Sequence, residues 1–229
     1  MKLLGSFAQA VQLLLVGDRE VYFIAFTSLW FSLVSVSIAA LWSLPLGFIL
    51  GYTSFRGRKA IVVLLNSLMA VPTVVVGLFI YSFLSRSGPL GSLGFLFTPK
   101  AVIIGQAVLC SPIIASLVYS ALSRLDVRLP ETLTTLGATR SQKFWMVLRE
   151  ARIAVASAIL AGFGRVIGEV GVSMILGGNI RWYTRTMTTA IALETSKGEF
   201  ERGIALGIIL VSIAVIVNAA LHSMVRHER

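Results

Sequence analysis

Five long apolar stretches, separated by short polar connections, dominate the hydrophobic pattern of this chain. They cover residues 21–50, 60–84, 101–122, 153–176 and 203–225. A helix rises about 1.5 Å per residue, so each stretch can cross the roughly 30 Å of hydrocarbon in a bilayer. The first stretch is the longest and must tilt, kink or begin in the membrane interface. The pattern predicts an all-α integral membrane protein with about five transmembrane helices.

The N-terminal residues show a shorter pattern of their own. Residues 3–16 alternate polar and apolar positions without reaching spanning length, which is typical of a helix lying in the membrane interface. We therefore expect residues 1–20 to form an external interfacial helix and residues 21–229 to form one transmembrane domain. A sixth span is an open alternative, and it would need Gly17-Asp18-Arg19-Glu20 as its tight exit.

Prolines and paired glycines modify the predicted spans. Pro45, Pro72 and Pro112 each lie inside or near the middle of a span, where proline removes a backbone hydrogen bond and bends the helix. Such bends either serve packing or open a pathway between helices. Glycines at four-residue spacing indicate that helices approach closely. The pairs are Gly47/Gly51, Gly164/Gly168 and Gly203/Gly207.

The composition excludes several classes of protein. The chain is 56% apolar and only 13% charged, whereas a soluble domain carries about 25% charged residues. The net charge of +10 arises mainly from the connections, so membrane topology explains it better than nucleic-acid binding. The single cysteine, Cys110, excludes an intrachain disulfide or a cysteine metal cluster. The sequence lacks a glycine-rich nucleotide loop and carries its two histidines at the C-terminal end, so we expect no metal site and no cofactor bound by this chain.

The distribution of lysine and arginine predicts the orientation. Eleven of these residues lie in the connections 51–59 and 123–152 and at the C-terminal end, eight lie in the other connections and the N-terminal region, and Arg165 lies inside a predicted span. Basic residues collect on the cytoplasmic side of a membrane. We therefore expect the N-terminus outside, the C-terminus in the cytoplasm and the connection around Glu131 on the cytoplasmic face.

A polar segment, residues 128–145, interrupts this otherwise apolar chain. Pro130 suits the first turn of a helix, and Gly137 can end that helix in the left-handed conformation. Thr139, with Gln142 three residues later, predicts a capping box that begins a second short helix. Two interpretations stand equally at this point: a hairpin that only joins two spans, or a docking element for a soluble motor protein.

The same segment resembles the cytoplasmic signature of ABC importer permeases. That signature reads Glu-Ala-Ala, three residues, Gly, nine residues, Ile, two residues, Leu-Pro, and the chain matches it at Glu131, Gly137 and Val147. The chain departs from it at Thr132-Leu133 and Glu150-Ala151. The resemblance implies that an ATPase subunit binds here. The coupling residues that it implies are Glu131, Leu133, Gly137, Ala138, Thr139, Arg140 and Phe144.

A second resemblance begins in the fourth apolar stretch. An Arg-x-x-Gly-Glu run at residues 165–169 precedes Gly-Gly-Asn-Ile at 177–180 and Thr-Arg-Thr at 184–186. These runs are similar to the oxyanion branch of ABC importer permeases, and within it they resemble the tungstate-uptake subgroup.

This resemblance implies a type I ABC importer fold in the cell inner membrane, working as a homodimer with the pathway at the subunit interface. Two copies of a separate ABC ATPase would use ATP and Mg, and an external substrate-binding protein would deliver the oxyanion, tungstate first and molybdate second. Two other functions remain alternatives. One is a passive channel or ion-coupled anion carrier, and the other is an ABC permease for another anion such as sulfate.

Arg165 and Glu169 lie four residues apart, in the register of a helical ion pair. Ionisable groups at this depth usually face a bundle interior or a watery cavity. The pair either packs as a neutral unit, which we favour, or changes partners when a gate opens; direct oxyanion binding by Arg165 is less favoured because Glu169 would repel the anion.

Residues 184–189, which follow the fourth span, carry hydroxyl donors, and the guanidinium groups of Arg181 and Arg185 lie beside them in the sequence. These groups either bind an oxyanion or form a docking surface for the external binding protein. The pathway candidates are Arg165, Gly168, Glu169, Asn179, Thr184, Arg185 and Thr186.

Overall fold

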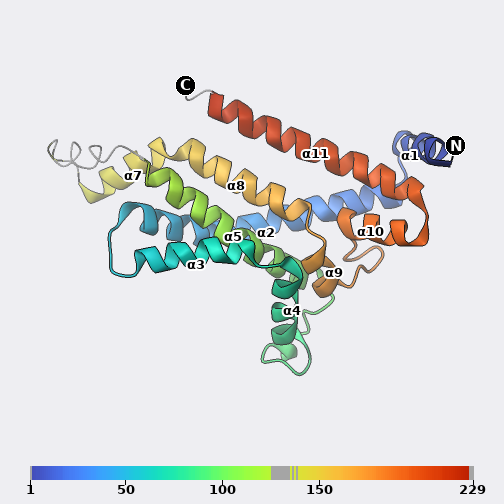
Figure 1. Cartoon of the computed structure of the whole chain (residues 1–229), viewed down its shortest axis with the longest axis horizontal. Helices are drawn as coiled ribbons and strands as arrows, with labels where there is room; N and C mark the ends of the chain where they lie inside the picture. The colour runs from blue at the N-terminus through green and yellow to red at the C-terminus, as the bar shows by residue number, and fades with distance from the viewer. Residues whose placement is uncertain (1, 125–134, 136, 138, 227–229) are drawn as a thin grey trace.

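The computed structural model describes residues 2–124, 135, 137 and 139–226, and this part of the chain contains helices and no strand (Figure 1). The all-α prediction is therefore confirmed. In chain order the helices are α1 (Lys2–Val16), α2 (Arg19–Tyr52), α3 (Arg58–Ala70), α4 (Thr73–Leu84), the 3₁₀ turn η1 (Gly91–Leu93), α5 (Pro99–Leu122), α7 (Arg140–Glu150), α8 (Arg152–Ile167), α9 (Gly171–Gly177), α10 (Met187–Lys197) and α11 (Phe200–Arg226).

Three helices are long and apolar enough to cross a membrane without a break: α2, α5 and α11 as far as Ser223. They correspond to the first, third and fifth predicted spans. Asp18 begins α2, because its side chain accepts a hydrogen bond from the Val21 backbone N–H at 2.9 Å. Pro45 in α2 and Pro112 in α5 both lie inside unbroken helices, so neither proline ends its span.

The second and fourth predicted spans are each divided into two helices. The axes of α3 and α4 are bent by 101°, and those of α8 and α9 by 63°. Pro72 explains the first break, which the sequence predicted as a bend, because proline lacks an N–H and holds Val71 in an extended conformation with ψ 131°. The sequence did not predict the break after Ile167. With each bent pair counted as one span, the described chain has up to five spans.

α5 is the central helix and packs against α2, α3, α4, α8 and α9. Its close contact with α2 depends on two glycines of α2. A Cβ at Gly47 would lie 2.8 Å from Val118 Cβ, and one at Gly51 would lie 2.5 Å from Leu122 Cβ. These distances are too short for any side chain, so the predicted close approach at this glycine pair is confirmed.

The other two glycine pairs make no such contact with the described residues. A Cβ at Gly203 would lie 3.8 Å from Glu194 Cβ, which is an ordinary contact distance. A Cβ at Gly207, Gly164 or Gly168 would meet open space. The prediction of close packing at Gly164/Gly168 and Gly203/Gly207 was therefore wrong for contacts among the described residues.

The long helices run side by side along one axis of the molecule, and α4 points away from this bundle (Figure 1). α1 lies at one end of the axis, where it packs on α11 and the Ser6 hydroxyl donates to Glu201 at 3.1 Å. α7 lies at the opposite end. The sequence predicted a helix at α1; its location in the membrane interface stays a prediction.

A buried carboxylate, Glu20, joins three segments at the α1 end. Glu20 is 6% exposed, and Arg181 donates to its two oxygens at 2.8 and 2.6 Å. Arg185 and Arg202 each have a guanidinium nitrogen 3.4 Å from the same carboxylate. Glu20 thus connects α2 to the loop after α9 and to α11. The hydrogen bond to Glu20 also raises the pKa of the Arg181 guanidinium above its ordinary value.

Replacing Glu20 by Gln removes the charge that these three guanidinium groups share. We expect Glu20→Gln to melt several degrees lower than the parent in detergent, because it leaves the largely buried Arg185 without its carboxylate partner and weakens the bonds to the more exposed Arg181 and Arg202. Glu199→Gln alters an exposed carboxylate in the short connection between α10 and α11 and should leave the melting temperature unchanged. Equal melting temperatures for the two variants would contradict this role of Glu20.

Gly47→Ala should force α2 and α5 apart, since the added methyl group would meet Val118 Cβ at 2.8 Å and the Ala115 carbonyl oxygen at 2.9 Å. We expect a loss of about 1–3 kcal/mol in the free energy of unfolding, as for other overpacked helix contacts. Unfolding in mixed detergent micelles measures this loss. Gly207→Ala in α11, whose methyl group meets open space, is the matched control and should cause no loss.

Candidate functional site

The break between α8 and α9 places a buried carboxylate inside the fourth span. Glu169 is 3% exposed, and one of its carboxylate oxygens accepts a hydrogen bond from the Val172 backbone N–H at 3.2 Å. Its backbone carbonyl accepts a hydrogen bond from the Thr188 hydroxyl of α10 at 2.7 Å. An unpaired polar group in hydrocarbon costs several kcal/mol. The side chains of Glu169 and Thr188 therefore pair with the Val172 N–H and the Glu169 carbonyl, two backbone groups that an unbroken helix would have bonded within itself.

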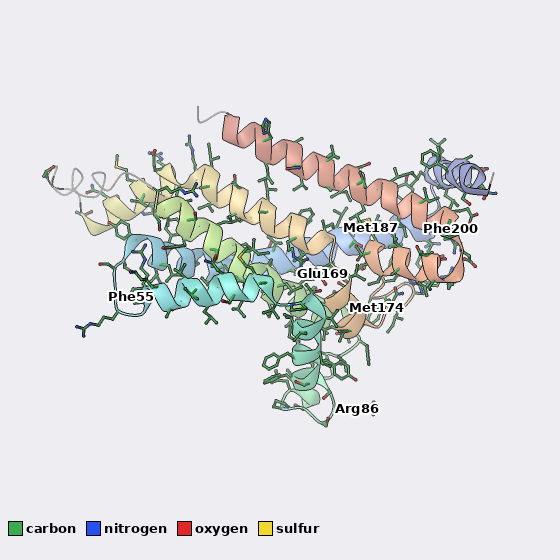
Figure 2. The ribbon with its side chains drawn as sticks, viewed as in Figure 1. Phe55, Arg86, Glu169, Met174, Met187 and Phe200 are labelled. Carbon is green, nitrogen blue, oxygen red and sulfur yellow. The ribbon has the colours of Figure 1, made fainter. Side chains whose placement is uncertain are left out.

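The predicted ion pair between Arg165 and Glu169 is present, with 2.7 Å between Nη1 and the second carboxylate oxygen. Its two members differ strongly in exposure: the Arg165 side chain is 41% exposed and the Glu169 side chain 3%. Figure 2 shows Glu169 at the point where α8 meets α9 and the upper end of α4. The pair thus presents its cation to the surface and keeps its anion inside. Whether it exchanges partners during gating stays a prediction.

The two helix breaks lie next to each other. A Cβ at Gly171, the first residue of α9, would lie 2.9 Å from Thr73 Oγ1 and 3.0 Å from Val74 Cγ2 of α4. Further along, a Cβ at Gly77 would lie 3.3 Å from Val172 Cα. α4 and α9 are therefore packed with their backbones close together. Exposed residues around the breaks are Val74, Val75, Leu78, Gly164, Arg165, Gly168, Val170 and Met174.

A buried polar network links three helices beside these breaks. Gln106 of α5 is 2% exposed; its carbonyl oxygen accepts from Ser35 of α2 at 3.1 Å, and its amide donates to Ser173 of α9 at 3.3 Å. A buried amide is costly unless it is hydrogen-bonded, so the network holds α9 in one position on α2 and α5. Our sequence analysis missed Gln106. The signal was a single glutamine in an otherwise apolar span.

The predicted oxyanion donors after α9 use their hydroxyl groups within the fold. The Thr184 hydroxyl donates to the Gly177 carbonyl and accepts from the Ile180 backbone N–H. Thr186 begins α10 in a capping box with Thr189. Thr184 is fully buried and Thr186 is 3% exposed. The structure thus explains both threonines as elements of the loop, and their contact with an oxyanion stays a prediction.

Arg185 and Asn179 lie in this loop, between α9 and α10, and both make hydrogen bonds within the fold. Arg185 donates to Glu20 at 3.4 Å and to the Asn179 carbonyl at 3.5 Å. The Asn179 amide donates to the Thr189 carbonyl at 3.3 Å. Both residues therefore stabilise the connection between α9 and α10. That Asn179 and Arg185 also line the translocation pathway stays a prediction.

The structure describes part of the polar segment at residues 128–145, where the sequence predicts that an ATPase subunit binds. Gly137 has φ +74°, the left-handed conformation expected where it ends a helix. The predicted capping box at the start of α7 is present, because the Thr139 hydroxyl accepts from the Gln142 N–H and the Gln142 side chain accepts from the Thr139 N–H. Two of the other predicted coupling residues, Arg140 and Phe144, belong to α7. The candidates outside the described residues are Glu131, Leu133 and Ala138.

The absence of a metal site stays a prediction, and the described residues bear on it only through their acidic, histidine and cysteine side chains. They contain no group of three or more His, Cys, Asp or Glu side chains placed to hold a metal ion. Cys110 is buried and unpaired with another cysteine. The polar groups assembled at the breaks are an ion pair, an amide and hydroxyls, and their observed partners are other side chains and backbone groups.

Known proteins match this chain over most of its length. Residues 43–227 match the family described as binding-protein-dependent transport system inner membrane component. The tungstate uptake system permease protein TupB of Peptoclostridium acidaminophilum is 40% identical over 219 residues, which cover 96% of each chain. A probable anion ABC transporter permease protein of Haloferax volcanii is 40% identical over 211 residues, covering 89% of this chain and 91% of the relative.

The fold has a counterpart among solved structures. The inward-facing MetNI methionine ABC transporter superposes with a TM-score of 0.70 over 91% of this chain and 94% of that chain, at 20% sequence identity. At this identity the likeness concerns the fold alone, and it confirms the predicted type I ABC importer fold. The chain therefore belongs to the family of binding-protein-dependent transport system inner membrane components, as a multi-pass membrane permease.

Proposed function

We propose that this permease imports an oxyanion across the cell inner membrane at the expense of ATP hydrolysis, with tungstate as the first candidate and molybdate as the second. The observation that carries the proposal is the 40% identity to a tungstate uptake permease over 96% of both chains. The two anions are tetrahedral dianions of similar shape, so a guanidinium or amide site for one also suits the other. Selection between them then depends on the binding protein that captures the anion.

The motor binds at residues 128–145 in this proposal. Two copies of a separate ATPase, which bind ATP and Mg, dock on the segment of each subunit and move it as a lever. Three features support this: the left-handed Gly137, the capping box at Thr139, and the exposure of Trp145 and Met146, which are 63% and 51% exposed on α7. The end of the molecule that carries α7 is then cytoplasmic, together with the C-terminus, and the α1 end faces the binding protein outside.

The pathway runs between two copies of the chain. A homodimer is supported by the exposure around the two helix breaks, where Arg165 is 41% exposed within a span that lipid would otherwise surround. A half-exposed guanidinium facing hydrocarbon is costly even when one of its nitrogens is paired with a carboxylate, so this surface suits a water-filled interface between subunits. The remaining apolar surface of α4 and α11 suits contact with lipid.

Vesicle uptake tests the transport class directly. We expect tungstate to accumulate only when the vesicles contain the permease with its ATPase and receive both ATP and the loaded binding protein. Molybdate should compete strongly and sulfate weakly. Uptake by the permease alone would instead support a passive channel or an ion-coupled carrier, and preferred accumulation of sulfate would contradict tungstate as the substrate.

Gly137→Val tests the lever. A β-branched residue in the left-handed conformation costs about 1–2 kcal/mol or more, so the bend before α7 should change and substrate-stimulated ATPase activity should fall while membrane insertion stays normal. Gly57→Val is the matched control, since Gly57 is also left-handed, with φ +95°, at the start of α3. Equal ATPase activity in the two variants would count against docking at residues 128–145.

A further inference from the structure

Arg165 is the charged side chain that the breaks leave at the surface of a span. It lies in the last turn of α8, within the bent pair of helices that forms the fourth span. Charged groups at this depth face protein or a water-filled cavity rather than lipid. The neighbouring Gly164 and Gly168 are also exposed and have no side chain, and a Cβ at either would meet open space. The surface beside the guanidinium is therefore unobstructed by this subunit.

The geometry of the ion pair leaves most of the guanidinium free to bind a ligand. Among the described residues, the Arg165 guanidinium makes one hydrogen bond, which Nη1 donates to Glu169. An arginine carries five N–H donors in a planar fork, so Nη2 and Nε keep donors for another acceptor. Glu169 cannot present its oxygens in the same way, because it is buried and bonded to Arg165 and the Val172 N–H. An anion that approaches this surface meets donors before it meets the carboxylate.

We propose that Arg165 contacts the tetrahedral oxyanion during its passage, through the Nη2 and Nε donors that Glu169 leaves unused. This inference rests on the proposed function and names the residue that the substrate meets inside the membrane. The buried carboxylate neutralises the guanidinium at short range and so keeps the attraction weak. Weak binding is what conduction requires, since an ion must enter a site and also leave it.

Substitution of both members of the pair separates substrate contact from packing. In vesicles with the complete transporter, Arg165→Gln should lower ATP-driven tungstate uptake at least about tenfold, the loss expected for a hydrogen bond to a charged group. Arg165→Lys should retain part of the uptake because it keeps the charge without the planar fork. The double variant Arg165→Gln/Glu169→Gln contains no uncompensated buried charge, and we expect its uptake to stay as low as in Arg165→Gln. Recovery of uptake in the double variant would overturn the proposal, because it would assign the pair to packing alone.

Protection of a cysteine gives a second readout that packing would not change. Gly164→Cys places a thiol beside Arg165 in open space, and the native Cys110 is fully buried and adds no label. During turnover, a membrane-impermeant anionic thiol reagent should label Gly164→Cys, and tungstate should slow the labelling in the parent background but not in Arg165→Gln. Equal protection in both backgrounds, or no labelling at all, would overturn the proposal. ATP-driven uptake by the unsubstituted complex reports on the proposed function separately, so the two failures are distinguishable.

Discussion

The structure depends on one constraint: inside hydrocarbon, every backbone N–H and C=O needs a partner within the protein. An unbroken helix without proline, such as α11, meets this constraint by itself along its middle. A helix that stops midway does not, and the chain compensates at the second break with side chains. Glu169 accepts the Val172 N–H, and Thr188 donates to the Glu169 carbonyl. The break therefore persists because a carboxylate and a hydroxyl from two different segments replace the lost backbone bonds.

This compensation determines where the molecule can have polar character. Glu169 must be buried to reach the backbone of α9, and its charge then requires Arg165, which remains partly at the surface. The Gln106 network holds α9 against α2 and α5 from the other side. The result, in the described part of the chain, is an apolar scaffold around α5 with a buried polar region near the point where α4 and α9 pack, separate from the charge cluster at Glu20. α7 lies away from this region, at one end of the long axis (Figure 1).

Sequence reasoning succeeded where the determinants are local. The capping box at Thr139 and the ion pair between Arg165 and Glu169 each involve residues three or four positions apart, and both are present. The predicted spans follow from length and hydropathy, and the structure has up to five.

Contacts that close long loops could not be predicted in this way. The break after Ile167 has no proline to mark it and depends on the packing of α4 against α9. The bond between Glu20 and Arg181 joins residues 161 positions apart, and neither residue has a local partner that would indicate it. The hydrogen bonds of Thr184 and Thr186 within the fold likewise depend on where α9 and α10 lie, which the local sequence does not indicate.

We propose that energy enters this permease at the α7 end, from the cytoplasm, and substrate at the α1 end, from outside. Single cysteines at Gln142 and Gln9, introduced into a Cys110→Ser chain and labelled with a membrane-impermeant reagent, test it most directly. We predict that Gln9→Cys is labelled in intact cells and that Gln142→Cys is labelled only in inverted membrane vesicles. Labelling of Gln142→Cys from outside the cell would contradict the account, since a cytoplasmic ATPase could not then reach α7.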